Sequence, residues 1–300
     1  SVADEVFLYT TGMLDFRGLG VELIFFKGAI DKLGIDVQII RGSNNKFKSA
    51  VEPFLYSQMS DENREQVMTY LNSLWSNMLS NIKSSRNISI EQMNEIADSI
   101  HIRNASSAVE FQLVDRLIYE DELHSLLKTK TDTPEDDELN LVPFSKYCKS
   151  KSQEDKMDFD NESNSGNIAI VYAVGDIVSG EGERNQIGSE KIASAIQEAR
   201  LNDEVKAIVL RVNSPGGSAL ASDVIWREVI LAKEAKPFIV SMGDVAASGG
   251  YYISCGADWI FAQPNTITGS IGVFGMIPNV GPMLENKLGI TFDRAQTNNH

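Results

Sequence analysis

Apolar residues in the second half of the chain alternate between short continuous runs and stretches with helical spacing. The runs are rich in β-branched residues and predict strands at 167–172, 205–212, 237–242 and 258–262. The stretches between them predict helices at 189–200 and 219–233, with a further helix opening near Ala247. Near-continuous apolar strands that alternate with helices are typical of a parallel sheet covered by helices. We therefore predict an α/β fold.

The first half of the chain has a different pattern. After a strand–helix–strand start that includes a strand at 36–40, residues 61–127 have mostly helical spacing. We interpret this segment as an inserted helical arm. Its aromatic and leucine side chains are interpreted as core positions, and no chemistry is assigned to it.

Acidic residues separate the two halves. The net charge is −15, and residues 132–162 contain ten acids and four lysines, which is −6 of that total. The stretch is also rich in Ser and Asn and has little apolar surface to bury. It predicts a solvated linker at 131–166 between segments 1–130 and 167–300, with an acidic recognition segment as the alternative.

Composition excludes several functional classes. A chain this acidic lacks the basic stripe that nucleic-acid binding requires. No apolar run reaches the ~18–20 residues of a membrane span. The two cysteines, Cys148 and Cys255, are too few for a disulfide framework or a zinc site, so we interpret them as ordinary thiols.

Three ordered matches suggest an internal duplication at an offset of about 254 residues. Ala-Asp-Glu-Val-Phe at 3–7 matches Ala-Asp-Trp-Ile-Phe at 257–261, and Lys-Leu-Gly-Ile occurs at 32–35 and at 287–290. Arg41 and the Asn pair at 44–45 match Arg294 and the Asn pair at 298–299. The pattern predicts two tandem α/β repeats. We expect both to be truncated in this chain.

Two glycine-rich turns follow predicted strands and carry the candidate chemistry. The first is Asn-Ser-Pro-Gly-Gly-Ser at 213–218, whose outward N–H groups at a helix start suit an anion or simply form a tight turn. The second, Gly-Asp-Val-Ala-Ala-Ser-Gly-Gly at 243–250, places Ser248 among small residues. The N–H of Gly249 would face a carbonyl attacked by Ser248, as in nucleophile elbows. The alternative is that Ser248 only caps a helix.

A serine nucleophile needs a base. The three histidines are His101, His124 and His300, and none lies in a strand–loop context near Ser248. A lysine can serve if burial keeps it neutral. Lys48, which follows the strand at 36–40 in a locally apolar run, is the candidate.

Four runs resemble the signal peptide peptidase A (protease IV) family in its long, duplicated form. They are Val-Asn-Ser-Pro-Gly-Gly-Ser at 212–218, Ala-Ala-Ser-Gly-Gly-Tyr-Tyr-Ile-Ser at 246–254, Thr-Gly-Ser-Ile-Gly-Val-Phe-Gly at 268–275 and Phe-Lys-Ser-Ala-Val-Glu-Pro-Phe at 47–54. The Ser-Pro-Gly-Gly loop is shared with Clp protease and crotonases. The resemblance implies their β-β-α superhelical fold.

The resemblance also implies roles for individual residues in a Ser/Lys peptidase. Ser248 matches the nucleophile and Lys48 matches the general base, contributed by the other repeat. Gly217 and Gly249 match the backbone donors of the oxyanion hole. Ser270 matches a serine that orients the lysine. No metal or cofactor is implied.

The implied substrates are apolar peptides such as released signal peptides. The family resemblance further implies a homo-oligomer, expected to be a tetramer. It also implies an inner-membrane location in bacteria, with the catalytic domain on the periplasmic side and the anchor N-terminal of this chain. Two alternatives stay open: a crotonase-type acyl-CoA enzyme with carboxylate acid/base groups, and a non-catalytic scaffold. A Clp-like Ser-His-Asp triad is discounted for lack of a suitably placed histidine. A Clp-like triad would need a histidine where Val273 stands.

Overall fold

The computed structural model describes residues 3–42, 46–147 and 167–298. It contains two compact units, one formed by residues 1–19 and 74–166 and the other by residues 20–73 and 167–300. The long helix α3 (Asp61–Ser85) begins in the second of these units and ends in the first. Each unit has its own apolar core, and the two are described separately below.

The larger unit is built on a five-stranded parallel sheet. Its strands are β4 (Asn167–Val174), β7 (Val205–Ser214), β8 (Phe238–Ala247), β9 (Trp259–Phe261) and β10 (Ile267–Gly269). The order is β10-β8-β7-β4, and β9 pairs with β8 beyond this path. All of these pairs are parallel. The predicted α/β class with parallel strands is therefore confirmed.

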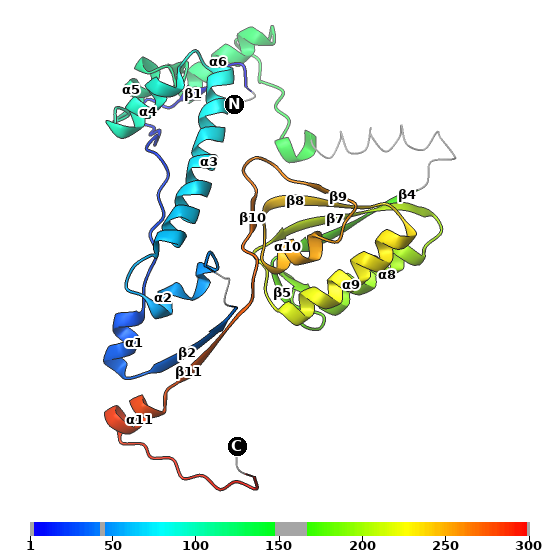
Figure 1. The fold of residues 1–300 in the computed structure, drawn as a ribbon. Helices are drawn as coiled ribbons and strands as arrows, with labels where there is room; N and C mark the ends of the chain where they lie inside the picture. Colours follow the sequence, from blue (N-terminus) through cyan, green and yellow to red (C-terminus); the bar gives the residue numbers. More distant parts are fainter. Residues whose placement is uncertain (1–2, 43–45, 148–166, 299–300) are drawn as a thin grey trace. The chain divides into compact units, whose positions relative to one another are not determined.

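Helices α8 (Ser189–Leu201), α9 (Ala219–Ala235) and α10 (Gly249–Ser254) pack on this sheet (Figure 1). The buried positions of α9 include Ala221, Ile225, Val229 and Ala232, a spacing that places them on one face of the helix. Alternate residues of β7 and β8 meet this face and complete the core. The helix and strand predictions for this half are thus confirmed.

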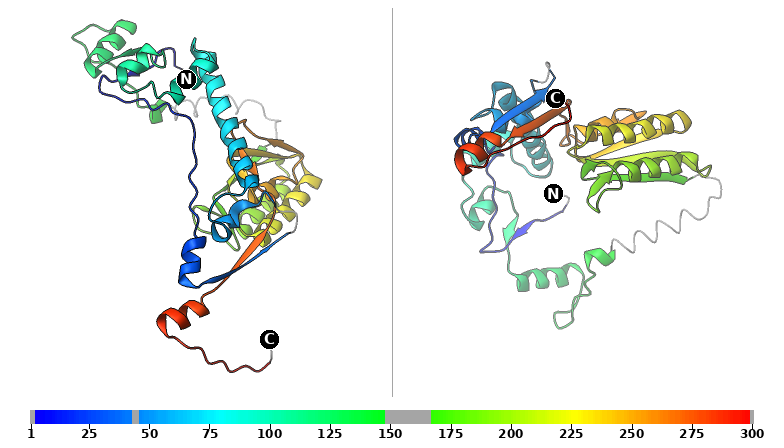
Figure 2. Two further views of the ribbon diagram at one scale, coloured as in Figure 1. Left: turned by 60° about the vertical axis from the view of Figure 1, so that its left-hand side comes forward. Right: turned by 90° about the horizontal axis from the view of Figure 1, so that it is seen from below.

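Smaller elements complete the same unit. They are α1 (Lys27–Leu33), β2 (Asp36–Arg41), the short 3₁₀ turn η1 (Ser49–Val51), α2 (Glu52–Leu55), β5 (Asp176–Val178), β6 (Gln186–Gly188), β11 (Phe274–Asn279) and α11 (Gly281–Leu288). Strands β5 and β6 pair in parallel. Strands β2 and β11 pair antiparallel over six residues and run side by side in Figure 2, although 232 residues lie between the end of one and the start of the other.

This β2–β11 pair explains a difference from the predicted domain organisation. Residues 20–73 group with 167–300, whereas the sequence pattern divided the chain at residues 130 and 166. The backbone hydrogen bonds between β2 and β11 join residues 20–73 to the second half, while the change of unit between residues 166 and 167 coincides with the end of the predicted linker. The repeat boundaries remain a prediction, although α1 and α11, which end in the matched Lys-Leu-Gly runs, both have a left-handed glycine as the C-cap.

The smaller unit is mainly helical. It contains β1 (Phe7–Leu8), α4 (Ile90–Asp98), α5 (Ala105–Glu110), β3 (Arg116–Leu117) and α6 (Glu120–Lys130), with β1 and β3 paired in parallel. Ser89 and Asn104 form capping boxes at the starts of α4 and α5. The helical character predicted for 61–127 is confirmed. Most of the predicted acidic linker, from residue 148 onward, lies outside the described residues.

Candidate active site

Ser248 occupies a strained junction between β8 and α10. Its backbone angles are φ 55° and ψ −116°, a conformation that non-glycine residues rarely adopt. The Ser248 N–H donates to the Gly269 carbonyl at 2.8 Å, and the Ser248 carbonyl accepts from the Tyr252 N–H at 2.9 Å. The strand, the adjoining helix and β10 thus fix this residue, which lines a pocket at a strand-to-helix turn, the kind of turn on which a nucleophile elbow is built.

The glycine-rich loop after β7 lies directly against the junction. Gly216 has φ 104°, and a Cβ built there would lie 2.6 Å from the Gly249 N and 2.8 Å from the Ser248 Cβ. Gly217 has φ 156°, and its Cβ would lie 2.1 Å from the Ile177 carbonyl oxygen. Neither position accepts a side chain without a shift of the backbone. The loop therefore needs glycines because two backbones approach closely there.

Two backbone N–H groups beside Ser248 are available as donors. The Ile177 N–H donates to the Gly216 carbonyl and the Ser218 N–H donates to the Ile177 carbonyl, each at 2.9 Å. These two hydrogen bonds involve the residues on either side of Gly217 and leave the Gly217 N–H out. Within the described part of the chain, the N–H groups of Gly217 and Gly249 donate to no protein acceptor. A pair of backbone donors next to a serine hydroxyl is the arrangement that stabilises an oxyanion.

Buried serines that the sequence analysis did not single out hold this loop. Ser214 is fully buried; its hydroxyl donates to the Gly175 carbonyl at 2.6 Å and accepts from the Gly216 N–H at 3.1 Å. Ser222, also fully buried, donates to the Ser218 carbonyl at 2.8 Å. The signal for Ser214 was present, because it precedes the Pro-Gly-Gly run, but its inward direction depends on the packing of β7.

Lys48 reaches the same place from a segment 200 residues earlier. Its side chain is buried, and its Nζ lies 3.1 Å from the Ser248 Oγ. The Nζ also donates to the carbonyl oxygen and the hydroxyl of Ser270, at 2.5 Å and 3.1 Å. Burial lowers the pKa of the Lys48 ammonium below its ordinary value, because desolvation penalises the charged form. This favours a neutral amine that can accept a proton.

Ser270 follows β10 and has a left-handed backbone conformation, with φ 50°. Its carbonyl and hydroxyl both face the Lys48 amine. The structure thus brings together Ser248, Lys48 and Ser270, with Gly217 and Gly249 beside the nucleophile. All five residues belong to the larger unit.

A pocket of about 350 Å³ opens beside Ser248. Its lining is mostly apolar or backbone: Gly217, Ala219, Ser222, Ser248, Gly249, Tyr251, Tyr252, Cys255, Ile271, Gly272 and Val273. No carboxylate, histidine or lysine side chain is among these lining residues. The pocket therefore suits an uncharged, apolar side chain next to the reactive hydroxyl.

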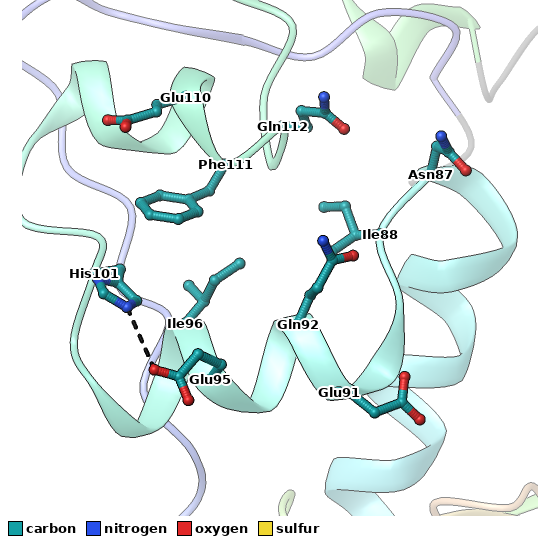
Figure 3. A pocket seen from close by; sticks show the side chains of 10 residues that line it. All are labelled: Asn87, Ile88, Glu91, Gln92, Glu95, Ile96, His101, Glu110, Phe111 and Gln112. Carbon is teal, nitrogen blue, oxygen red and sulfur yellow. Dashed lines mark ion pairs between the residues drawn. The ribbon is translucent and has the colours of Figure 1, made fainter.

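The described histidines belong to the smaller unit. His101 belongs to the smaller unit, where it lines a separate pocket of about 480 Å³ (Figure 3). Its ring stacks on Phe111, and its Nε2 lies 3.7 Å from the Glu95 carboxylate. His124 is on α6 of the same unit, and His300 lies outside the described residues. Val273, at the position where a Clp-like triad would need a histidine, lines the pocket beside Ser248.

Comparison with known proteins identifies the family. The model of peptidase family S49 matches residues 1–133 and 230–300. The chain is 37% identical to Protease 4 of Haemophilus influenzae over 305 residues, which is 99% of this chain and 48% of that protein. The chain belongs to peptidase family S49. The resemblance expected from the sequence motifs is confirmed.

Other S49 relatives give the same picture. Protease 4 of Salmonella typhi is 38% identical over 99% of this chain and 48% of its own length. The chloroplastic serine protease SPPA of Arabidopsis thaliana is 34% identical over 90% of this chain and 39% of its own length. The chain thus spans about half the length of the bacterial relatives.

Similar solved structures cover smaller parts. A substrate-peptide complex of the 1510-N membrane-bound stomatin-specific protease is 25% identical, with a TM-score of 0.27, over 32% of this chain and 41% of that one. ClpP1 from Listeria monocytogenes is 20% identical, with a TM-score of 0.24, over 29% of this chain and 46% of that one. The fold class assigned to this S49 chain rests on the parallel sheet and covering helices described above.

Several further features bear on this S49 chain. Of the helices that the structure describes, none is long and apolar enough to cross a membrane. No group of three or more His, Cys, Asp or Glu residues suited to a metal ion occurs within residues 3–42, 46–147 and 167–298. Cys255 is a free, exposed thiol, whereas Cys148 lies outside the described residues.

Proposed function

We propose that this S49 chain belongs to a serine endopeptidase in which Ser248 is the nucleophile and Lys48 is the general base. The observation that carries the proposal is the 3.1 Å contact between the Lys48 Nζ and the Ser248 Oγ, made by a buried lysine with a lowered pKa. An amine that is neutral and within hydrogen-bond reach can take the hydroxyl proton.

The proposed reaction proceeds through an acyl-enzyme. Lys48 accepts the proton of Ser248 as the hydroxyl oxygen attacks a peptide carbonyl. The N–H groups of Gly217 and Gly249 stabilise the oxyanion, an interaction worth about 2.7–4 kcal/mol for one donor in another protease. The Lys48 ammonium then gives its proton to the leaving amine. Water, deprotonated by Lys48, releases the acyl group.

Ser270 keeps the base aligned in this proposal. Its carbonyl and hydroxyl oxygens accept from the Lys48 amine and hold the remaining lone pair toward Ser248. Both acceptors are uncharged, so they orient the amine without the strong stabilisation of the ammonium form that a carboxylate would give. A neutral base therefore remains accessible.

The substrates are proposed to be apolar peptides, such as signal peptides released after secretion. The mostly apolar pocket beside Ser248 supports this class. We further propose a membrane-associated homo-oligomer, a tetramer, in the bacterial inner membrane with the catalytic domain on the periplasmic side. These features follow from the family resemblance.

The rival readings lack support at this site. A crotonase-type reaction would use carboxylates as acid and base, and no Asp or Glu side chain lines the pocket that contains Ser248. A non-catalytic scaffold would gain nothing from a buried lysine beside a strained serine, since both are costly to the fold. The peptidase reading uses both features.

Cleavage of an apolar fluorogenic peptide by the full-length protein tests the proposal. Ser248→Ala and Lys48→Ala are each expected to reduce kcat by about 10⁴- to 10⁶-fold, the range for removal of catalytic groups that act as a unit. Lys46→Ala is the control, because Lys46 is exposed and two residues away. A fluorophosphonate should label Ser248. Turnover retained in either catalytic variant, or labelling of another serine, would reject the dyad.

A further inference from the structure

Glu52 is a buried carboxylate with no part in the proposed reaction. It is 2% exposed and lies at the first position of α2, four residues after Lys48. Burial of a carboxylate is costly unless its oxygens accept hydrogen bonds. The Glu52 carboxylate therefore needs hydrogen-bond donors around it.

Three donors from the start of α3 satisfy this carboxylate. One oxygen accepts from the Ser60 hydroxyl at 2.5 Å. The other accepts from the Ser60 backbone N–H at 3.2 Å and from the Asn63 side-chain amide at 2.8 Å. Asn63 is itself buried, at 2% exposed. These three hydrogen bonds, which we call the Glu52 tie, join α2 to α3.

The tie lies one short turn from the proposed base. Only η1, Ser49–Val51, separates Lys48 from Glu52, and Val51 is fully buried. A second and longer contact joins the same segment to α3, from the Gln66 side-chain amide to the Ser49 hydroxyl at 3.4 Å. A displacement of Glu52 would therefore move the backbone that carries Lys48.

Charge does not explain the presence of Glu52. The polar atoms that face the Lys48 Nζ are those of Ser248 and Ser270, and those that face the Glu52 carboxylate belong to Ser60 and Asn63. In the described part of the chain neither residue has an ion-pair partner. Stability alone does not explain it either, since well-packed apolar residues often serve at least as well as buried charges.

We propose that Glu52 is a positioning residue, whose tie to Ser60 and Asn63 holds the Lys48 amine in its buried place beside Ser248. This rests on the proposed role of Lys48 as the base. The tie sets where the lysine backbone lies, and Ser270 sets how its amine points. Loss of the tie lets Lys48 move away from Ser248 and toward water.

Glu52→Leu and Glu52→Gln test this in the full-length protein. Leucine removes every acceptor, so kcat is expected to fall about 10- to 100-fold, as a displaced catalytic group does, with KM within twofold. The increase of kcat/KM with pH should occur at higher pH than in the wild type, because a more hydrated Lys48 is more easily protonated. Glutamine keeps one acceptor oxygen, and its amide can donate to the Ser60 hydroxyl, so kcat should stay within threefold of wild type.

Val67→Ala is the matched control for stability. Val67 is a buried apolar residue of α3 outside the tie, and its truncation should lower the melting temperature without moving the pH profile. If Glu52→Leu does not fold, Asn63→Ala removes a single donor and should change kcat and the pH profile in the same direction, by less.

Three results would overturn the proposal in distinguishable ways. A folded Glu52→Leu variant with wild-type kcat and pH profile, while Lys48→Ala is inactive, would remove Glu52 from the site and leave the dyad intact. Equal losses in Glu52→Leu and Val67→Ala with an unmoved pH profile would reduce the tie to a structural role. Turnover retained by Lys48→Ala would instead reject the base, and this proposal with it.

Discussion

The proposed nucleophile, Ser248, and the proposed base, Lys48, are held by different kinds of structure. Ser248 stands between β8 and α10, whose neighbouring side chains Ala246 and Ile253 are fully buried in the core of the parallel sheet. Lys48 stands on a short segment with a three-residue 3₁₀ turn and a four-residue helix, fixed by the hydrogen bonds of a buried carboxylate. Apolar packing and backbone hydrogen bonds of regular elements thus set the serine, whereas side-chain hydrogen bonds of a buried carboxylate set the segment of the lysine.

The difference indicates that the serine and the lysine need different kinds of support. A strained serine and close glycine backbones need a rigid support, which a packed sheet supplies. A neutral lysine needs burial without a charged partner. Here the segment that carries Lys48 is held at Glu52, four residues further along, by the uncharged donors of Ser60 and Asn63. Substitutions on the serine side should therefore affect rate through geometry, and those on the lysine side should also affect its dependence on pH.

After loss of the Ser248 hydroxyl itself, the largest effect on the serine side is expected for Gly217→Ala. The added Cβ would lie 2.1 Å from the Ile177 carbonyl oxygen, so the loop must shift and its N–H leaves the oxyanion position. We expect kcat for an apolar peptide to fall about 10²- to 10³-fold. Gly28→Ala in α1, where nothing lies within 4 Å of the added Cβ, is the control. Wild-type kcat in a folded Gly217→Ala variant would exclude this N–H as a donor.

The second prediction concerns Lys48: kcat/KM should depend on pH. The protonated amine is inactive, so kcat/KM should rise about tenfold per pH unit until the lowered pKa of Lys48 is passed. Because burial lowers that pKa, the plateau should begin below the ordinary lysine value of about 10.4. The check is a kcat/KM profile of the full-length protein between pH 5 and pH 10. A rate independent of pH over this range would contradict a lysine base.

Ser270→Ala should have a smaller effect. It removes the hydroxyl acceptor 3.1 Å from the Lys48 Nζ but keeps the backbone acceptor at 2.5 Å. One neutral hydrogen bond corresponds to about a three- to tenfold decrease in kcat. Ser57→Ala, at an exposed serine of the same unit, provides the baseline. A loss as large as that of Lys48→Ala would instead give Ser270 a direct part in the proton transfer.

Lys48→Met should stabilise the fold while it abolishes activity. A lysine with a lowered pKa in the folded state destabilises that state in full below the lowered pKa. The penalty decreases as pH rises toward the ordinary value of about 10.4. The melting temperature should therefore increase at pH 7, and the gain should shrink at higher pH. Lys46→Met, at an exposed position, should show no such trend. A lower melting temperature at pH 7 would contradict the burial penalty.

His101→Gln should change catalysis least. His101 stacks on Phe111 in the pocket of the smaller unit shown in Figure 3, whereas the residues of the Ser248 site all belong to the larger unit. We expect kcat/KM for an apolar peptide to stay within twofold of wild type. A tenfold loss with an unchanged melting temperature would give the helical unit a role in turnover that the site geometry does not contain.

Local sequence predicted much of the larger unit and the serine half of the candidate site, whereas the roles of Lys48 and Ser270 were implied by the family resemblance. The parallel strands and covering helices followed from apolar periodicity, because each element buries its own face. The serine junction and the glycine loop were also local signals, since each is a short run between a strand and a helix. The family followed from the same motifs. By contrast, the grouping of residues 20–73 with the second half was not predicted, because it depends on the pairing of β2 with β11.

Sequence by itself therefore determined the α/β class and the family, and it singled out the serine junction at Ser248 and the glycine loop beside it as the candidate site. Only the tertiary structure decided that Lys48, one of 27 basic residues, lies buried 3.1 Å from the Ser248 hydroxyl, and that the buried Glu52 carboxylate accepts hydrogen bonds from Ser60 and Asn63. Turn and helix signals are local because backbone geometry and side-chain spacing are local. Burial, and with it the lowered pKa of a lysine, exists only after distant segments pack together.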